Sequence, residues 1–448
     1  MEVFKIIILL TLIAFLALVL RTEWVILFRR RVFIVWLTAF LALGVRTGEL
    51  SNRISLTAQE DSISTLLITL LFLNTLSSLR AIFCMSPKFP RLLGSLLVVL
   101  SSICIIFFLC TTWFNFYIYF ELRLIPIMLI VIGWGYQIER LRAAKAIILY
   151  TIGGSAPLLI CVAWSRSTGV IFLAQANSSF RRGPFFWVST SLLLAFLVKL
   201  PILFLHIWLP KAHVEAPVLG SIFLAAVLLK LGGFGILKGL RVLTTRKPLA
   251  GVLAAISIWR IIFVSIACTQ AVDVKVLIAL SSVAHIGAGL LALLSNFELR
   301  ELVFLLVLVS HGFSSSIIFF QRFMFYKNSS TRSLLLNKRA TSIRGRFILI
   351  WILSCLAILG APPTFNLWVE IIVFSLRVII IPRTIKILFW GALITGAYAF
   401  ICIRVLNSGN QYFLLFSLKT YSLLDIRHLL FSVALVVRIS VCLPISLS

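Results

Sequence analysis

The chain has 448 residues, of which 61% are hydrophobic and 12% are charged, whereas a soluble domain carries roughly 25% charged residues. This composition excludes a soluble enzyme, and the 37 Phe and 11 Trp residues exclude a disordered or fibrous chain. The chain is nevertheless basic, because its 41 Lys and Arg outnumber its 13 Asp and Glu and give a net charge of +28.

Apolar runs of transmembrane length follow one another along the whole chain. A hydrocarbon core about 30 Å thick takes about 20 residues in a helix, and about fourteen runs come close to that length. In chain order they span residues 3–20, 32–45, 63–85, 92–110, 113–133, 146–164, 187–208, 218–237, 249–268, 274–294, 302–320, 347–376, 387–405 and 424–443. The sequence therefore predicts an all-α, polytopic membrane protein of about 14 transmembrane helices.

The connections between these runs are short. The longest polar stretches, 46–61, 174–184 and 326–346, are loops by composition and leave no room for a soluble domain. The run 3–20 is also a candidate signal peptide, but no clear small-residue cleavage site precedes Arg21, so we expect a retained first helix. The N-terminus likewise lacks the Arg- and Ser-rich amphipathic pattern of a mitochondrial transit peptide.

The basic residues lie mostly at the ends of the apolar runs. The longest basic cluster is Arg29, Arg30 and Arg31, which falls short of the basic, aromatic-bearing face that nucleic acid requires. Short connections rich in Lys and Arg are typical of the positively charged side of a membrane protein. We therefore expect lipid, and no nucleic acid, around this chain.

Sequence signals for metal and nucleotide chemistry are missing. The eight cysteines form no CxxC pair and have no His at zinc-ligand spacing. The sequence also contains no GxGxxG after a strand, no GxxxxGK[ST] and no GxSxG. We therefore predict no metal site, no bound nucleotide and no hydrolytic chemistry in this chain.

Two carboxylates, Glu121 and Glu370, lie inside long apolar runs, whereas the other acidic residues sit at segment ends or in loops. An ionisable group that faces lipid costs at least about 2.5–3.5 kcal/mol, so it normally faces the interior of the bundle. Each of these two glutamates marks a proton or ion path or, alternatively, a structural ion pair.

Lys199 and Lys230 stand near the middle of two successive apolar runs. Burial disfavours the charged ammonium, and a nearby carboxylate restores it. A lysine and a glutamate in a dry interior therefore form a proton switch whose state depends on how close the two side chains are.

Prolines accompany two of these buried charges. Pro201 follows Lys199 by two residues, and Pro362 and Pro363 precede Glu370 by about two helical turns. Prolines are common in spanning helices, so each one alone is a weak signal. Broken helices beside buried charges in both halves of a chain are nevertheless typical of inverted-repeat transporters.

Two of the five histidines, His285 and His311, lie inside apolar runs. Each one is either a proton relay between a lysine and a glutamate or a structural core histidine. His206 and His213 flank LPKAH at a segment end, where we expect them to order a loop or a water-filled entrance, and His428 is expected at the interface.

Four motifs together carry a resemblance to a known family. They are FYIYFELRLIPIMLIVIGWGYQIERL (116–141), KLPILFLHIWLPKAHVEAPVLGSIFLAAVLLKLGGFG (199–235), SSVAHIGAGL and GAPPTFNLWVE. In order and spacing the chain resembles, over about residues 92–405, the antiporter-like membrane subunits of NADH:ubiquinone oxidoreductase (respiratory complex I) and the multisubunit cation/proton antiporters.

The resemblance implies an architecture and an activity. It implies fourteen helices with two inverted five-helix repeats, here 91–240 and 241–406, flanked by an N-terminal part, 1–90, and a C-terminal helix in 407–448. It implies proton translocation coupled to redox chemistry in other subunits. No redox centre is expected in this chain, because NADH, FMN, the iron–sulfur clusters and ubiquinone are used by the rest of the complex. The expected partners are other membrane-arm subunits, and the expected location is the mitochondrial inner membrane.

The resemblance also implies roles for the buried polar residues. Glu121 modulates Lys199, Lys230 links onward, and Glu370 lies on the exit side. His285 and His311 match the central histidines of the family.

Arg123 departs from the family pattern, which has a small or apolar residue two positions after this glutamate. Residues two apart point to different sides of a helix, so Arg123 need not neutralise Glu121. An ion pair between Arg123 and Glu121 would weaken the switch role of Glu121. The same question arises in other apolar runs for Arg260, Arg377, Arg404 and Arg438.

Two alternatives stay open at this point. The first is a subunit of a sodium/proton antiporter, although the few interior acids favour protons because sodium prefers several oxygen ligands. The second is a structural spacer whose buried charges are locked in ion pairs.

Overall fold

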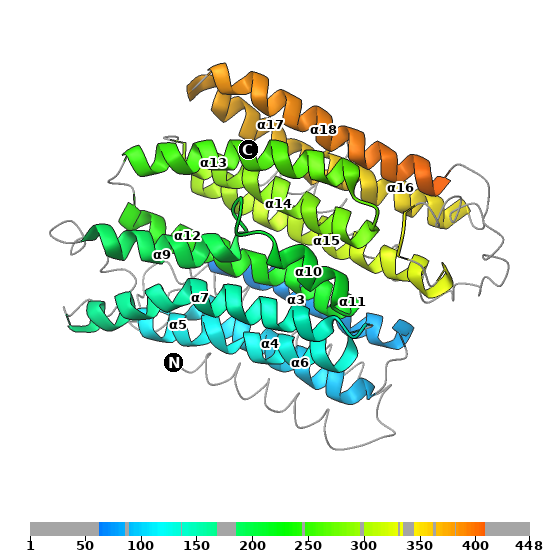
Figure 1. The fold of residues 1–448 in the computed structure, drawn as a ribbon, viewed down its shortest axis with the longest axis horizontal. Coiled ribbons are helices and arrows are strands. Elements are labelled where there is room, and N and C mark those ends of the chain that lie inside the picture. The colour runs from blue at the N-terminus through cyan, green and yellow to red at the C-terminus, as the bar shows by residue number, and fades with distance from the viewer. Residues whose placement is uncertain are drawn as a thin grey trace. The chain divides into compact units, whose positions relative to one another are not determined.

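The computed structural model describes residues 62–85, 89–135, 137–167, 185–243, 247–295, 300–329, 332–334, 345–361, 364–380 and 382–407. Within these ranges the secondary structure consists of helices (Figure 1), apart from an isolated antiparallel β-bridge that joins Asp273 and Ser333. This confirms the all-helical fold class for the described part of the chain. The predicted runs that lie outside it are 3–20, 32–45 and 424–443.

The helices follow the predicted apolar runs, because a backbone surrounded by lipid must satisfy its hydrogen bonds within the chain. In chain order they are α3 (Ser62–Met85), α4 (Pro90–Leu109), α5 (Trp113–Leu122), α6 (Leu124–Trp134), α7 (Arg140–Ser167), α9 (Phe185–Lys199), α10 (Trp208–Glu215), α11 (Val218–Phe223), the π-helix η2 (Leu224–Leu228), α12 (Leu229–Leu243), α13 (Lys247–Gln270), α14 (Val274–Leu293), α15 (Arg300–Ser329), α16 (Gly345–Leu359), α17 (Phe365–Ile380) and α18 (Pro382–Asn407).

Seven stretches of the described residues are helical, long enough and apolar enough to cross a membrane. They are Pro90–Leu109, Trp113–Trp134, Arg140–Ala163, Val218–Gly239, Ala250–Gln270, Val274–Leu293 and Arg300–Lys327. A polytopic membrane protein is therefore the architecture that length and hydropathy indicate.

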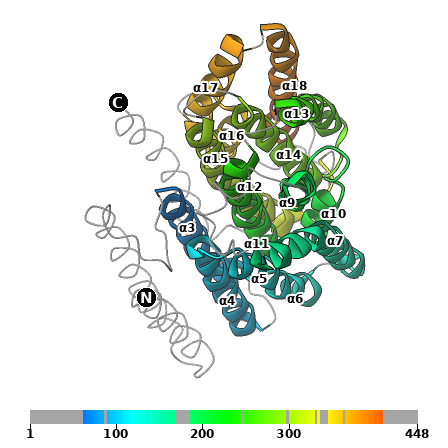
Figure 2. The same ribbon diagram turned by 90° about the vertical axis from the view of Figure 1, so that its left-hand side faces the viewer.

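The chain divides into two compact units. The first unit includes α3 to α7, α9 and most of α12. Within it α7 packs against α9 and α4 packs against α5 and α6, and Figure 2 shows α3 beside α4. Its centre is aromatic, because five buried rings pack together there: Phe107, Phe116, Phe120, Phe196 and Phe234.

The second unit includes most of α10, η2 and α13 to α18. Within it α14 packs against α13 and α15, α18 packs against α13 and α16, and α17 packs against α15 and α18. Part of its aliphatic core consists of Ala292, Val303, Leu306, Val307, Val369 and Val373.

Several of the apolar runs are interrupted. Arg123 forms a turn between α5 and α6, and Pro126 lies where it cannot donate to the carbonyl of Leu122. The run 187–208 divides in the same way, because α9 ends at Lys199 and α10 begins only at Trp208.

Two further irregularities accompany buried charges. The π-helix η2 ends two residues before Lys230, and π segments inside α-helices are frequent at functional sites. Gly360 ends α16 with a positive φ of 66°, and α17 begins at Phe365. Pro362 and Pro363 lie between these two helices, outside the described residues.

Candidate functional site

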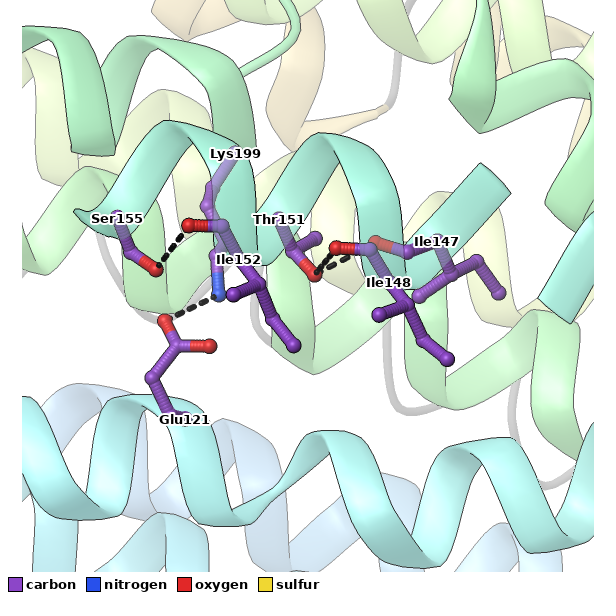
Figure 3. A network of polar contacts seen from close by, with 7 residues as sticks. All are labelled: Glu121, Ile147, Ile148, Thr151, Ile152, Ser155 and Lys199. Carbon is purple, nitrogen blue, oxygen red and sulfur yellow. Dashed lines mark hydrogen bonds and ion pairs between the residues drawn. The ribbon is translucent and has the colours of Figure 1, made fainter. Parts of the chain in front are cut away.

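Lys199 and Glu121 form an ion pair in the first unit, in which Lys199 is buried and Glu121 is partly buried. Their side chains point toward one another from α9 and α5, and Lys199 Nζ donates to Glu121 Oε1 at 3.3 Å (Figure 3). The side chain of Lys199 is 4% exposed and that of Glu121 is 18% exposed. Lys199 is the last residue of α9, where the helix dipole favours a cation.

The structure thus brings together two residues that are 78 positions apart in the sequence. Taking both charges out of water costs several kcal/mol per ion, which their mutual attraction offsets only while they stay in contact. Glu121 Oε2 is buried without a hydrogen-bond partner among the described residues. The contact between the two side chains therefore offsets part of the cost of burying each charge.

Arg123 lies against aromatic rings rather than against a carboxylate. Its side chain is 1% exposed, and its guanidinium carbon is 4.5 Å from the centre of the Phe120 ring and 6.0 Å from that of Phe107. Glu121 pairs with Lys199 instead. In the described part of the chain, Glu121 therefore makes its ion pair with Lys199 and not with Arg123.

Lys230 is the second residue of α12 and is fully buried. The residues just before it form η2, in which the hydrogen bonds span one residue more than in an α-helix.

A second polar cluster lies in the second unit. His285 Nδ1 on α14 is 3.4 Å from Glu370 Oε1 on α17, and the rings of His285 and His311 on α15 are 6.2 Å apart between centroids. His285 Nε2 is buried without a hydrogen-bond partner among the described residues. Three of the predicted site residues thus lie close together on three different helices.

Gly360 makes room for the carboxylate of Glu370. A Cβ atom on Gly360 would lie 2.6 Å from Glu370 Oε2, and the positive φ of this residue disfavours any side chain there. The end of α16 therefore approaches the carboxylate closely. In the sequence, the only local signal for Gly360 is its place just before Pro362 and Pro363.

Arg260 on α13 holds the chain where it leaves α9. Its Nη1 donates to the carbonyl oxygens of Leu200 at 2.9 Å and Pro201 at 3.1 Å. A Cβ atom on Gly287 would lie 2.9 Å from Arg260 Nε, so this glycine leaves space for the guanidinium. Arg260 therefore supplies hydrogen bonds to two carbonyls that follow the end of the helix.

We expect Arg260→Met to weaken the structure at this position. The substitution keeps an apolar stem of similar length but leaves two buried carbonyls without a donor, at a cost of about 1–3 kcal/mol each. Thermal inactivation of the assembled complex should then occur several degrees lower, while Arg91→Met, at an exposed arginine of α4, should leave it unchanged. Equal inactivation temperatures for both variants would contradict this role.

His206 and His213 have different surroundings. His206 lies between α9 and α10 and is partly exposed. His213, which we expected at a loop or a hydrated entrance, lies within α10 with no exposed surface, and its ring stacks on that of Phe319 at 4.9 Å. It therefore has the surroundings of a core histidine.

The fold and these contacts define a class of protein: a polytopic helical membrane protein with ionisable residues buried beside interrupted helices. Among the residues that the structure describes, no three His, Cys, Asp or Glu side chains are grouped so that they would hold a metal ion.

Comparison with known proteins gives the family. A family model described as "NADH:quinone oxidoreductase/Mrp antiporter, TM" matches residues 110–395. The chain is 38% identical over 319 residues to NADH-ubiquinone oxidoreductase chain 4 of Scyliorhinus canicula, covering 69% of this chain and 68% of the relative. It is 36% identical over 307 residues to the chain 4 of Artemia franciscana, covering 68% and 78%.

Solved structures have the same fold. The chain is similar to a chain of the respiratory complex I from Thermus thermophilus with bound NADH, with a TM-score of 0.82, 21% identity and coverage of 98% and 95%. It is equally similar, at 16% identity and coverage of 98% and 93%, to a chain of the archaeal membrane-bound sulfane sulfur reductase. The chain belongs to the NADH:quinone oxidoreductase/Mrp antiporter family. The resemblance carried by the four sequence motifs is thereby confirmed.

Proposed function

We propose that this chain is a proton-translocating membrane-arm subunit of the respiratory NADH:ubiquinone oxidoreductase in the mitochondrial inner membrane. The names of its relatives support the assignment to this complex, and the apolar helices support a membrane location. The observation that carries the proposal is the buried pair of Lys199 and Glu121.

The proposed cycle begins at this pair. Lys199 is protonated while Glu121 is in contact with it, as in the structure. When a neighbouring subunit draws Glu121 away, the unpaired ammonium in a dry interior releases its proton. The proton then passes through water to Lys230, His285 and His311.

Glu370 is the proposed last carrier in this chain. Its contact with His285 gives the proton a direct acceptor. We take the direction of proton transfer from the family. The proposed architecture of fourteen helices with two inverted repeats, 91–240 and 241–406, comes from the same source.

In this proposal the chain does no redox chemistry. NADH, FMN, iron–sulfur clusters and ubiquinone act in other subunits, and this chain works as part of an H⁺-translocating NADH:ubiquinone reductase. Its partners are the neighbouring membrane-arm subunits and lipid.

The test of the proposal is the variant Glu121→Gln in the assembled complex. The amide keeps the shape of the side chain but cannot hold the Lys199 ammonium as an ion partner. We expect the number of protons translocated per NADH oxidised in sealed vesicles to fall at least about fivefold, which corresponds to a coupling of about 1 kcal/mol. Glu301→Gln, at the start of α15, is the matched control. An unchanged proton ratio in Glu121→Gln would contradict the proposal.

The alternatives have less support. In a sodium/proton antiporter we expect several oxygen ligands around the ion, whereas Glu121 and Glu370 each contact a nitrogen base. A structural spacer, whose buried charges stay locked in ion pairs such as that of Lys199 and Glu121, predicts an unchanged proton ratio in Glu121→Gln.

A further inference from the structure

Arg123 is a buried cation that the proposed proton route does not use. It forms the turn between α5 and α6, directly beyond the helix that carries Glu121. Its Nε and Nη1 are buried without hydrogen-bond partners in the described part of the chain. A guanidinium does not lose its proton in proteins, so Arg123 brings a permanent positive charge into the interior of the first unit.

Arg123 and Lys199 share one aromatic ring. Lys199 Nζ is 3.9 Å from the centre of the Phe120 ring, and Arg123 Cζ is 4.5 Å from the same centre. The negative face of an aromatic ring attracts cations, so Phe120 holds two basic groups close together in the interior. Glu121, the next residue along the chain, supplies the carboxylate.

The charge of this group of three side chains depends on Lys199. With Lys199 protonated, Arg123 and Lys199 together carry two positive charges against the single negative charge of Glu121. After Lys199 has released its proton, Arg123 and Glu121 balance each other. Net charge is costly at low dielectric constant. Charge balance therefore favours the group of three side chains in which Lys199 has released its proton.

We infer that the permanent charge of Arg123, held close to Lys199 by the shared Phe120 ring, favours release of the proton from Lys199. This inference rests on the proposed function. In the step itself an N–H bond of the Lys199 ammonium breaks, its electron pair stays on nitrogen, and the proton passes to water on the way to Lys230. Arg123 contacts neither the proton nor its acceptor. It acts on Lys199 through its charge and is therefore a positioning residue.

The test compares two variants of Arg123 in the assembled complex. Arg123→Met keeps the length of the side chain and its contact with the rings but removes the charge, whereas Arg123→Lys keeps the charge. In sealed vesicles, we expect proton translocation per NADH oxidised to fall about tenfold in Arg123→Met and less than about twofold in Arg123→Lys. Arg142→Met, at an exposed arginine of α7, is the control and should match the unmodified complex.

The outcomes separate this inference from the proposed function. If Arg123 only fills space between the rings, Arg123→Met should pump as well as Arg123→Lys, and the inference is overturned. Lys199→Ala is measured in parallel. Normal pumping in Lys199→Ala overturns the proposed function itself, whereas blocked pumping there with normal pumping in Arg123→Met overturns only the role of Arg123.

Discussion

Lys199→Ala in the assembled complex should abolish proton translocation through this chain. The substitution removes the group that we propose gains and loses the proton, and it leaves Glu121 without its ion partner. Breaking a buried pair in this way costs about 3–5 kcal/mol. Protons translocated per NADH oxidised in sealed vesicles are the measurement.

Lys199→Arg tests whether residue 199 must release a proton or only carry a positive charge. Arginine keeps a cation near Glu121 but does not give up its proton. We therefore expect Lys199→Arg to assemble and yet to pump as poorly as Lys199→Ala. Lys145→Ala, at an exposed lysine of α7, is the control. Pumping by Lys199→Arg at the level of the unmodified complex would rule out proton release from residue 199.

Glu370→Gln should block the path at its far end. His285 Nδ1 lies 3.4 Å from Glu370 Oε1, and an amide in that position accepts a hydrogen bond but does not take up the proton. We expect proton translocation to fall at least about tenfold, because no other carboxylate of the described residues contacts His285.

Glu370→Asp is the companion variant to Glu370→Gln. Aspartate keeps the acid but is one methylene shorter, so the distance to His285 increases while the chemistry is unchanged. We expect partial activity, between that of Glu370→Gln and that of the unmodified complex. Loss of activity in Glu370→Asp with normal activity in Glu370→Gln would show that the carboxylate is not the proton carrier.

The position of Glu370 depends on the end of α16 as much as on its own helix. Gly360 approaches the carboxylate so closely that any Cβ atom there would collide with it. Such a close approach has no periodic signal in a sequence. The site residues themselves were visible, because a charge inside an apolar run is costly whatever its neighbours are.

The partners of these charges could not be read from the sequence. Residues 121 and 199 meet because α5 and α9 both lie in the first unit and each ends at this point. The contact of Arg123 with Phe120, and that of Arg260 with the carbonyls after Lys199, depend in the same way on how helices pack and where they break. Local composition specifies neither the packing of the helices nor the positions at which they break.

The membrane class, the helical fold and the small set of buried ionisable residues follow from the amino-acid sequence alone, because transfer into an apolar interior depends on residue type and segment length. The pairing of Glu121 with Lys199, the pairing of His285 with Glu370 and the contact of Arg123 with aromatic rings depend instead on the packing of the helices. Pairing energies depend on distance and on the local dielectric constant, and both are set by residues far apart in the chain.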